Sequence, residues 1–333
     1  MTLPEFWFVL VGFLFSGYFL LEGFDFGVGT LLPVLGRRDD VDRRIMINTI
    51  GPVWDMNETW LIVAGASLFA AFPYWYATLF SGFYLPLLLI LVALIVRGLA
   101  FEYRAKRDDD GWRGRWDAAI IIGSWVPAVL WGVAFANILR GVPIDADHEY
   151  VGGFFNLLGP YALLGGVTTA LLFLTHGAMF IALKTDGEIR NRARALGGKL
   201  GLGAAAAAVA FLTWTQVQTG GTASAVAFVV AALSLVAGLA AVWQGREGWA
   251  FIGTFLAIVV AVAGLFLALF PDVMPTNLVG GESLTTTNAA ATAYTLKIMT
   301  IVAVVFTPVV LAYQGWTYWV FRRRLAVHHI PAS

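Results

Sequence analysis

The sequence predicts an all-α polytopic membrane protein, and three observations support this fold class. Hydrophobic residues make up 59% of the 333 residues and charged residues only 13%, so the chain is more apolar and less charged than soluble domains usually are. Apolar runs of about 20 residues recur along its whole length, and each is long enough to cross the hydrocarbon core of a bilayer. The alternating segments of about ten residues that are typical of a transmembrane barrel do not occur.

The apolar runs indicate nine transmembrane helices. They lie at residues 6–34, 51–72, 77–100, 117–139, 158–183, 197–217, 222–243, 248–270 and 293–321. The first run is expected to be a true membrane helix and not a cleavable signal. It is too long for a signal, contains acidic residues and has no basic segment before it.

The distribution of lysine and arginine predicts how these helices are oriented. Cations gather in every second connection and after the last span: Arg37, Arg38, Arg43 and Arg44; Arg104, Lys106, Arg107, Arg113 and Arg115; Lys184, Arg190, Arg192, Arg194 and Lys199; Arg246; and Arg322, Arg323 and Arg324. The alternate connections carry almost none, apart from Arg140 and Lys297 near span ends. Because cytoplasmic loops are enriched in Lys and Arg, we expect the N-terminus outside and the C-terminus in the cytoplasm.

A weak internal repeat suggests how the helices are grouped. A shift of 154 residues places Glu22-Gly23-Phe24-Asp25-Phe26 over His176-Gly177-Ala178-Met179-Phe180, and four spans separate the two copies. The expected architecture is therefore one membrane domain, 1–333, made of two four-helix bundles and a ninth helix. The first bundle would comprise 1–140, the second 158–243 and 248–270, and the ninth helix 293–321. Chance matching of Gly and Phe in an apolar chain is the alternative explanation.

Most of the ionisable residues inside the predicted spans lie in the cytoplasmic half of the membrane. The set consists of Glu22, Asp25, Asp55, Glu58, Arg97 and His176. Glu22 and Asp25 are spaced i, i+3, as are Asp55 and Glu58, so each pair shares one helix face. Acids within membrane helices are rare and usually face a protein interior or a water path. The set therefore predicts a proton-uptake path that opens to the cytoplasm.

A purely structural role is the alternative for part of this set. Arg97 would pair with one acid, and Asp55 and Glu58 would be favoured by the dipole at a helix N-terminus. One arginine cannot neutralise four acids, however, so some of them must be protonated or reach water. Gly23 and Gly27 form a small-xxx-small pattern, which predicts close approach of a neighbouring helix.

The histidines and the missing cysteines restrict cofactor binding in this chain. There is no cysteine, which excludes disulfides and thiolate metal sites. His176 alone lies in a span, so no haem is assigned to this chain. His328 and His329 near the C-terminus are expected to be solvated, and no metal site is assigned. The net charge of zero gives no indication of nucleic-acid binding.

The segments around these acids also carry a family resemblance. They are Glu22-Gly-Phe-Asp25-Phe-Gly-Val-Gly29, Arg43-Arg44-Ile-Met-Ile-Asn48, Gly51-Pro-Val-Trp-Asp55-Met-Asn57, Trp60, Phe80-Ser-Gly-Phe-Tyr84, Gly132-Val-Ala-Phe-Ala-Asn137, Phe270-Pro-Asp-Val-Met-Pro275 and Tyr318-Trp319. Over nearly its whole length the chain resembles subunit II of the cytochrome bd quinol oxidases.

This resemblance implies a subunit of a respiratory quinol:oxygen oxidoreductase in the bacterial cytoplasmic membrane. The chain would not be catalytic alone. The haems b558, b595 and d and the quinol-oxidising loop would belong to the larger subunit I, which this chain would support. It would lend a cytoplasmic proton path for the reduction of O₂ to water, and in some members it holds a structural quinone. Small single-helix accessory subunits, membrane lipid and quinone are the further partners suggested.

The resemblance also implies roles for single residues. Asp55 matches the proton-channel aspartate, and Trp60 matches the tryptophan at the mouth of an oxygen channel. Glu22 keeps a carboxyl where the family usually has aspartate, whereas Glu58 stands where glutamine is frequent. An autonomous ion-coupled transporter that uses the same acids at a repeat interface is the alternative function. Only the oxidase subunit should co-purify with a haem-bearing partner.

Overall fold

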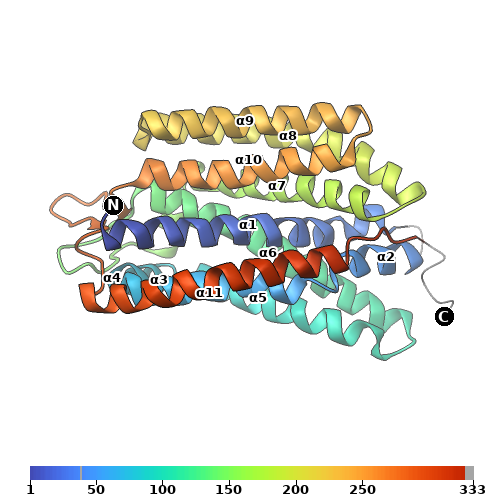
Figure 1. Ribbon diagram of the computed structural model, residues 1–333, viewed down its shortest axis with the longest axis horizontal. Helices are drawn as coiled ribbons and strands as arrows, with labels where there is room; N and C mark the ends of the chain where they lie inside the picture. Colours follow the sequence, from blue (N-terminus) through green and yellow to red (C-terminus); the bar gives the residue numbers. More distant parts are fainter. Residues whose placement is uncertain (38–39, 327–333) are drawn as a thin grey trace.

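The structure is a computed structural model, and it describes residues 1–37 and 40–326. It is an elongated bundle whose long helices run roughly along one axis (Figure 1). Among the described residues, eight helices are long and apolar enough to cross a membrane. They are α1 (Leu3–Leu35), α5 (Tyr84–Tyr103, extended by the short η1 at Arg104–Lys106), α6 (Asp110–Arg140), α7 (Pro160–Lys184), α8 (Glu188–Thr219), α9 (Thr222–Trp243), α10 (Glu247–Leu269) and α11 (Ala293–Val320). The all-helical membrane fold is thus confirmed.

Helix α1 lies at the centre of the molecule. It begins with a capping box in which Thr2 and Glu5 satisfy each other's backbone N–H groups, and it packs against α3, α6, α7 and α10. Its crossing with α7 is close because Gly27 meets Gly177 there. A Cβ atom on Gly27 would stand 2.0 Å from the carbonyl oxygen of Phe173 and 2.8 Å from Cα of Gly177. The close helix approach predicted from Gly23 and Gly27 is therefore confirmed.

The segment expected to hold the second and third spans is divided differently. Helix α3 (Trp54–Ala71) ends at Phe72, and a separate helix, α4 (Pro73–Gly82), follows before α5 begins at Tyr84. Proline has no backbone N–H and clashes with the preceding turn, so Pro73 can start a helix but not continue one. The continuous span expected at 77–100 is wrong in its first part, because α4 ends at Gly82 and α5 begins only at Tyr84. Helix α3 is not among the eight helices above, because its polar residues lower its hydropathy.

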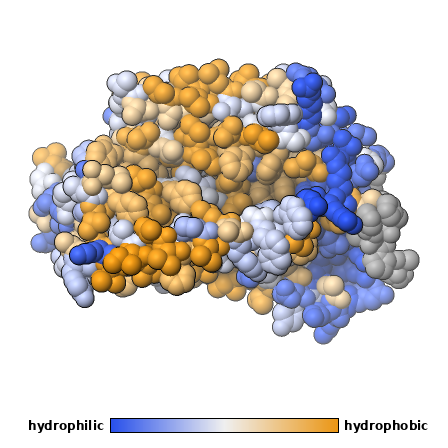
Figure 2. Space-filling model, viewed as in Figure 1, coloured by the Kyte–Doolittle hydropathy of each residue, from blue (hydrophilic) through white to orange (hydrophobic). Residues whose placement is uncertain are grey.

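Two helices extend beyond the predicted membrane limits at the basic end of the bundle. Helix α8 begins at Glu188 and not at residue 197, and α6 begins at Asp110 and not at residue 117. In α8 the apolar residues Ile189 and Ala193 are buried, so the helix continues past the apolar run on one packed face. The amphipathic helix α2 (Asp40–Ile50) lies at the same end, where Figure 2 shows hydrophilic side chains gathered.

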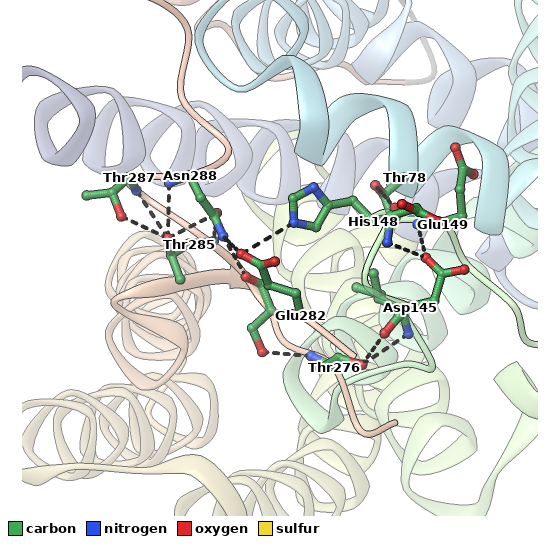
Figure 3. A network of polar contacts seen from close by, with 12 residues as sticks. Thr78, Asp145, His148, Glu149, Thr276, Glu282, Thr285, Thr287 and Asn288 are labelled. Carbon is green, nitrogen blue, oxygen red and sulfur yellow. Dashed lines mark hydrogen bonds and ion pairs between the residues drawn. The ribbon is translucent and has the colours of Figure 1, made fainter. Parts of the chain in front are cut away.

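The opposite end is closed by two loops that contact each other and α4. They contain η2 (Phe154–Leu158) and a small antiparallel pair, β1 (Asp272–Met274) and β2 (Leu284–Thr285). In Figure 3 the polar side chains of these loops converge. The Thr78 hydroxyl of α4 donates to the carbonyl oxygen of His148 at 2.7 Å, and the His148 Nε2 lies 3.7 Å from a Glu282 oxygen. The Thr276 hydroxyl donates to the carbonyl oxygen of Ile144 at 2.7 Å. These contacts fix α4 at this end.

Candidate functional site

A fully buried ion pair joins α1 to α5. A guanidinium nitrogen of Arg97 lies 2.7 Å from a carboxylate oxygen of Glu22, and neither side chain is exposed. The guanidinium carbon also lies 4.8 Å from the ring centre of Phe26 and 5.3 Å from that of Phe101. Gly123 of α6 permits this arrangement, because a Cβ there would stand 2.7 Å from Cβ of Arg97. Sequence and structure therefore agree that Arg97 pairs with one of the acids.

This pair leaves several polar atoms without a partner in the part of the chain that the structure describes. They are Oε1 of Glu22, and Nε and Nη2 of Arg97. A guanidinium has five N–H donors, and here one nitrogen makes a hydrogen bond to a described residue. Buried polar atoms normally find partners, and each one left over costs about 1–3 kcal/mol. The pair is therefore under-satisfied, which is unusual for a merely structural ion pair.

Asp25 begins a hydrogen-bonded chain that crosses three helices. One carboxylate oxygen accepts a hydrogen bond from the Asn57 amide of α3 at 2.8 Å, while its other oxygen has no partner among the described residues. The Asn57 carbonyl oxygen in turn accepts from the Tyr318 hydroxyl at 2.7 Å and from the Gln314 amide at 3.2 Å, both of α11. The indole of Trp60 donates to the Gln314 carbonyl oxygen at 2.8 Å.

Three residues of this hydrogen-bonded network are not predicted as site residues by the sequence pattern: Asn57, Gln314 and Tyr318. The sequence does contain features that could have drawn attention to them. Asn57 lies two residues after Asp55, in the segment most specific for the family resemblance, and Gln314 is an amide inside a long apolar run. An uncharged amide is less conspicuous than a carboxylate in such a run. Its helix face can be assigned only when the neighbouring helix is known.

Asp55 and Glu58 both lie on α3, and Glu58 is the more buried of the two. Asp55 is exposed, whereas Glu58 is half-buried and its Oε2 has no hydrogen-bond partner. Glu58 is close enough to Asp55, Arg97 and Glu22 to interact with them electrostatically. Five of the six predicted proton-path residues therefore form one cluster, which runs from the surface at Asp55 to the buried pair of Glu22 and Arg97.

His176 is the predicted site residue that lies apart from this cluster. Its Nδ1 is hydrogen-bonded to the Thr254 hydroxyl of α10 at 2.7 Å, and its ring stacks on that of Phe251, with ring centres 4.6 Å apart. Phe24 contacts this histidine from the face of α1 that turns away from Glu22 and Asp25. No hydrogen bond or ion pair between described residues links His176 to the acids.

A second ionic network ties α2, α5 and α6 together at the basic end. Arg104 lies 2.5 Å from a carboxylate oxygen of Asp117 and 2.5 Å from one of Asp40. Partial burial acts to raise the pKa of the Asp40 carboxyl. The hydrogen bond from Arg104 and the nearby charges of Arg113 and Arg43 outweigh it and hold that pKa below its usual value. This network fixes the end of the bundle at which the path would open.

The described residues contain no group of three or more His, Asp or Glu side chains that could hold a metal ion. Two of the four histidines, His328 and His329, lie outside the described residues.

Fold and site together define a class of protein. It is a helical membrane protein with under-satisfied carboxylates at intramembrane depth, an arrangement that usually marks proton or ion pathways. Comparison with known proteins then identifies the family. The profile of "Cytochrome bd terminal oxidase subunit II" matches residues 3–321. The chain therefore belongs to the cytochrome bd terminal oxidase subunit II family.

Similar proteins are known from several bacteria. Subunit 2 of the cytochrome bd ubiquinol oxidase of Bacillus subtilis (strain 168) is 41% identical over 340 residues, which cover 100% of this chain and 99% of that protein. Subunit 2 of the cytochrome bd-I ubiquinol oxidase of Escherichia coli (strain K12) is 36% identical over 98% of this chain and 96% of that protein. A chain in the structure of bd oxidase from Geobacillus thermodenitrificans shares the fold, with a TM-score of 0.80 at 16% identity. That match covers 96% of this chain and 99% of the other.

These comparisons confirm the function expected from the resemblance. The chain is a subunit of a quinol:oxygen oxidoreductase and a multi-pass protein of the bacterial cytoplasmic membrane. Neither the described residues nor the comparisons support the transporter alternative.

Proposed function

We propose that, within the oxidase, this chain carries protons from the cytoplasmic side toward the haem-bearing subunit I. The path begins at Asp55, continues through Glu58 and ends at Glu22 and Asp25. The observation that carries the proposal is the gradient of burial along this series, from an exposed carboxylate to two carboxylates with no exposed surface. Each buried member has one oxygen without a hydrogen-bond partner, so each can accept a further hydrogen bond.

The charges within the cluster favour proton exchange. Arg97 is the cation paired with Glu22, whereas Asp25 has only the neutral amide of Asn57. A second ionised carboxylate in this dry region would cost several kcal/mol unless it is paired. A proton that arrives by Glu58 can therefore be accepted at Asp25 or Glu22. It is passed on when a change of charge in subunit I favours its transfer. In this proposal Arg97 holds Glu22 in place and limits the negative charge.

His176 joins this path only indirectly in our proposal. Its Nδ1 is engaged by Thr254, and its ring also lies against the backbone of Leu20 of α1. Phe24 separates it from the face of α1 that carries the acids. We therefore assign it to the packing of α7 against α10. The haems b558, b595 and d are assigned to subunit I.

The face for subunit I is proposed to include α3, α5 and α11. Helix α11 is exposed along nearly its whole length, although its residues are largely apolar. In Figure 1 it lies with α5 along one edge of the molecule. An apolar helix with so few contacts suits a partner subunit or lipid. Trp60, which is bonded to Gln314 of α11, is proposed to border an oxygen route near this face. A structural quinone and small accessory subunits are further proposals from the family resemblance.

Nine spans with an outside N-terminus and a cytoplasmic C-terminus remain our proposal for the topology. The position of α4 supports the count, because Thr78 contacts His148 in the loop that follows α6. Helix α2 lies at the opposite end (Figure 1), so α3, which lies between α2 and α4 in the chain, leads from that end toward α4. The division into bundles at 1–140 and at 158–243 with 248–270, plus 293–321, is likewise proposed. The crossing of α1 and α7 would join the two bundles.

The substitution Asp55→Asn in the assembled complex tests the proton path. We expect slower quinol oxidation and slower proton uptake with normal assembly, because the amide keeps the size of the side chain but cannot exchange a proton. The matched control is Asp108→Asn, which removes an acid that is 83% exposed and lies at the same end of the molecule. Full turnover and proton uptake in assembled Asp55→Asn would exclude Asp55 as the entry point.

A further inference from the structure

A second polar site lies far from the carboxylate cluster, at the basic end of α8 and α9. A pocket of about 510 Å³ opens there, lined by Arg194, Gly198, Lys199, Leu202, Trp243 and Gly245 among others. In Figure 1 these two helices form the edge of the molecule opposite α5 and α11. The pocket therefore lies away from the face proposed for subunit I, on an edge that lipid can reach.

The pocket carries positive charge that the protein does not neutralise. Glu247 is the nearby carboxylate, and Arg190 already binds both of its oxygens at 3.0 Å. Arg194 reaches the same carboxylate only at 3.4 Å. Lys199 makes no hydrogen bond or ion pair to any described residue and is exposed. Of the two cations that line the pocket, Arg194 has only a long contact with a carboxylate that already pairs with Arg190, and Lys199 has no such contact among the described residues, so the pocket attracts an anion.

Two glycines keep the donors of this pocket accessible. Gly245 has φ +72°, a conformation that L-residues rarely adopt, and a Cβ there would stand 3.0 Å from a guanidinium nitrogen of Arg194. A Cβ on Gly198 would stand 3.3 Å from the indole nitrogen of Trp243. That indole N–H has no partner among the described residues. A guanidinium, an ammonium and an indole N–H therefore border one hollow, the donor set that suits a phosphate group.

An apolar cavity lies farther along α8 and α9, toward the middle of the bundle, and residues of α6, α7 and α10 also line it. It has a volume of about 400 Å³, and Ala205, Val209, Leu235 and Val236 are among its mostly apolar walls. On α8, Leu202 of the polar pocket precedes Ala205 by three residues, about one helical turn. The polar pocket and the apolar cavity therefore lie one after the other along α8 and α9, with no lining residue in common, and Leu239 packs against Gly201 between the two helices there.

We propose that the outer surface of α8 and α9 binds an anionic phospholipid. Its phosphate would lie among Arg194, Lys199 and the indole of Trp243, and one acyl chain would run along the outer surface of α8 and α9 from the polar pocket to the apolar cavity. Basic pockets between membrane helices are suited to anionic headgroups, and tryptophan is enriched at headgroup level. A free phosphate would use only the polar part, and a quinone, which is uncharged, only the apolar part. The two parts together match an anionic amphiphile.

Lipid retention by the intact oxidase complex tests the proposal. The complex is purified in detergent and titrated with phosphatidylglycerol, with phosphatidylcholine and with inorganic phosphate, and bound lipid is measured by native mass spectrometry. We expect Lys199→Gln to bind phosphatidylglycerol about fivefold more weakly, the effect of one basic residue near a headgroup. The matched control, Arg115→Gln, removes an exposed cation from the same end of the molecule and should bind normally.

A second variant tests the apolar part. Ala205→Phe fills the cavity, so it should weaken phosphatidylglycerol binding while inorganic phosphate still competes at the polar pocket. Equal binding by Lys199→Gln and Arg115→Gln, or equal affinity for phosphatidylcholine, would overturn the proposal. So would loss of bound quinone and not of lipid in Ala205→Phe, because the cavity would then be a quinone site. Turnover and proton uptake are measured separately, so a failure of the proton path leaves this test intact.

Discussion

Asn57 makes more hydrogen bonds within the site, and joins more helices, than any of the acids beside it. Its single side chain donates to Asp25 and accepts from Tyr318 and Gln314, so it joins α1, α3 and α11. An amide can do this because it has both a donor and an acceptor end, whereas an ionised carboxylate only accepts. The buried face of α3 thus depends on a neutral residue.

Replacement of Asn57 by leucine should destabilise the complex strongly. Asp25, Tyr318 and Gln314 would each lose a hydrogen-bond partner, and each such loss costs about 1–3 kcal/mol. The measurement is thermal unfolding of the purified complex. Tyr318→Phe serves as the comparison, because it removes only one bond to Asn57 and should have a much smaller effect. If both variants unfold at the same temperature, Asn57 does not organise the network as we describe.

Trp60 allows a test of oxygen access at the residue scale. Its ring fits against Gly17, where a Cβ would stand 2.1 Å from the indole, and lies 5.7 Å from the ring of Phe13. Trp60→Ala should change the KM for oxygen with little change in kcat, because it alters the width of a route and not the chemistry. Trp249→Ala, on exposed surface of α10, is the control. An unchanged KM for oxygen would place the route in subunit I.

At the scale of elements, the crossing of α1 and α7 is the tightest constraint. Each helix contributes a glycine, and the backbones are so close that no side chain fits between them. The sequence pattern Gly23-x-x-x-Gly27 predicts such an approach but does not name the neighbour. Only the structure shows that it is α7, the helix paired with α1 by the weak internal repeat.

Gly27→Ala should impair assembly, although the change is a single methyl group. That methyl would overlap the carbonyl oxygen of Phe173, so α1 and α7 would have to move apart, and overpacking of this kind costs about 1–3 kcal/mol. Gly248→Ala is the matched control, because nothing lies within 4 Å of a Cβ at that position of α10, which is outside the face proposed for subunit I. The yield of assembled complex measures both. Normal yield from Gly27→Ala would show that the crossing is adaptable.

Helix boundaries show what the sequence can and cannot predict. The span at 222–243 agrees with α9, because its apolar run ends sharply at Gly221 and Gln244. The run at 77–100 is divided at Phe83, between α4 and α5, where Pro86 has no N–H to continue the hydrogen bonding of α4, and hydropathy alone does not show such a break. Helix α8 extends over basic residues because one packed face continues outside the membrane.

At the scale of the whole molecule, the described features predict which ends lie on the same side of the membrane. The chain has no cysteine, so single cysteines can be introduced and labelled without background. Tyr74→Cys and Ala146→Cys should both react with a membrane-impermeant reagent from outside, whereas the exposed control Ala105→Cys should react only from the cytoplasmic side. Labelling of Tyr74→Cys from the cytoplasmic side would show that α3 does not span.

The site was only partly predictable from the sequence. Charged residues in apolar runs stand out, so Glu22, Asp25, Asp55, Glu58 and Arg97 can be named, and the structure brings these five together. His176 satisfies the same criterion, yet it faces α10, because the side of a buried helix on which a residue lies depends on neighbours that sequence does not specify. For the same reason the partners of Asn57 on α11 could not be assigned.

The exposure of α11 also has a consequence for biosynthesis. This helix is the last described one to leave the ribosome, and it carries two of the three groups that bond to Asn57. Until it is inserted, the buried amide of Asn57 has only Asp25 as a partner, so the polar network is completed in the final moments of translation. The new helix then remains largely uncovered, and the rate at which subunit I arrives would set how long a quality-control protease can reach it.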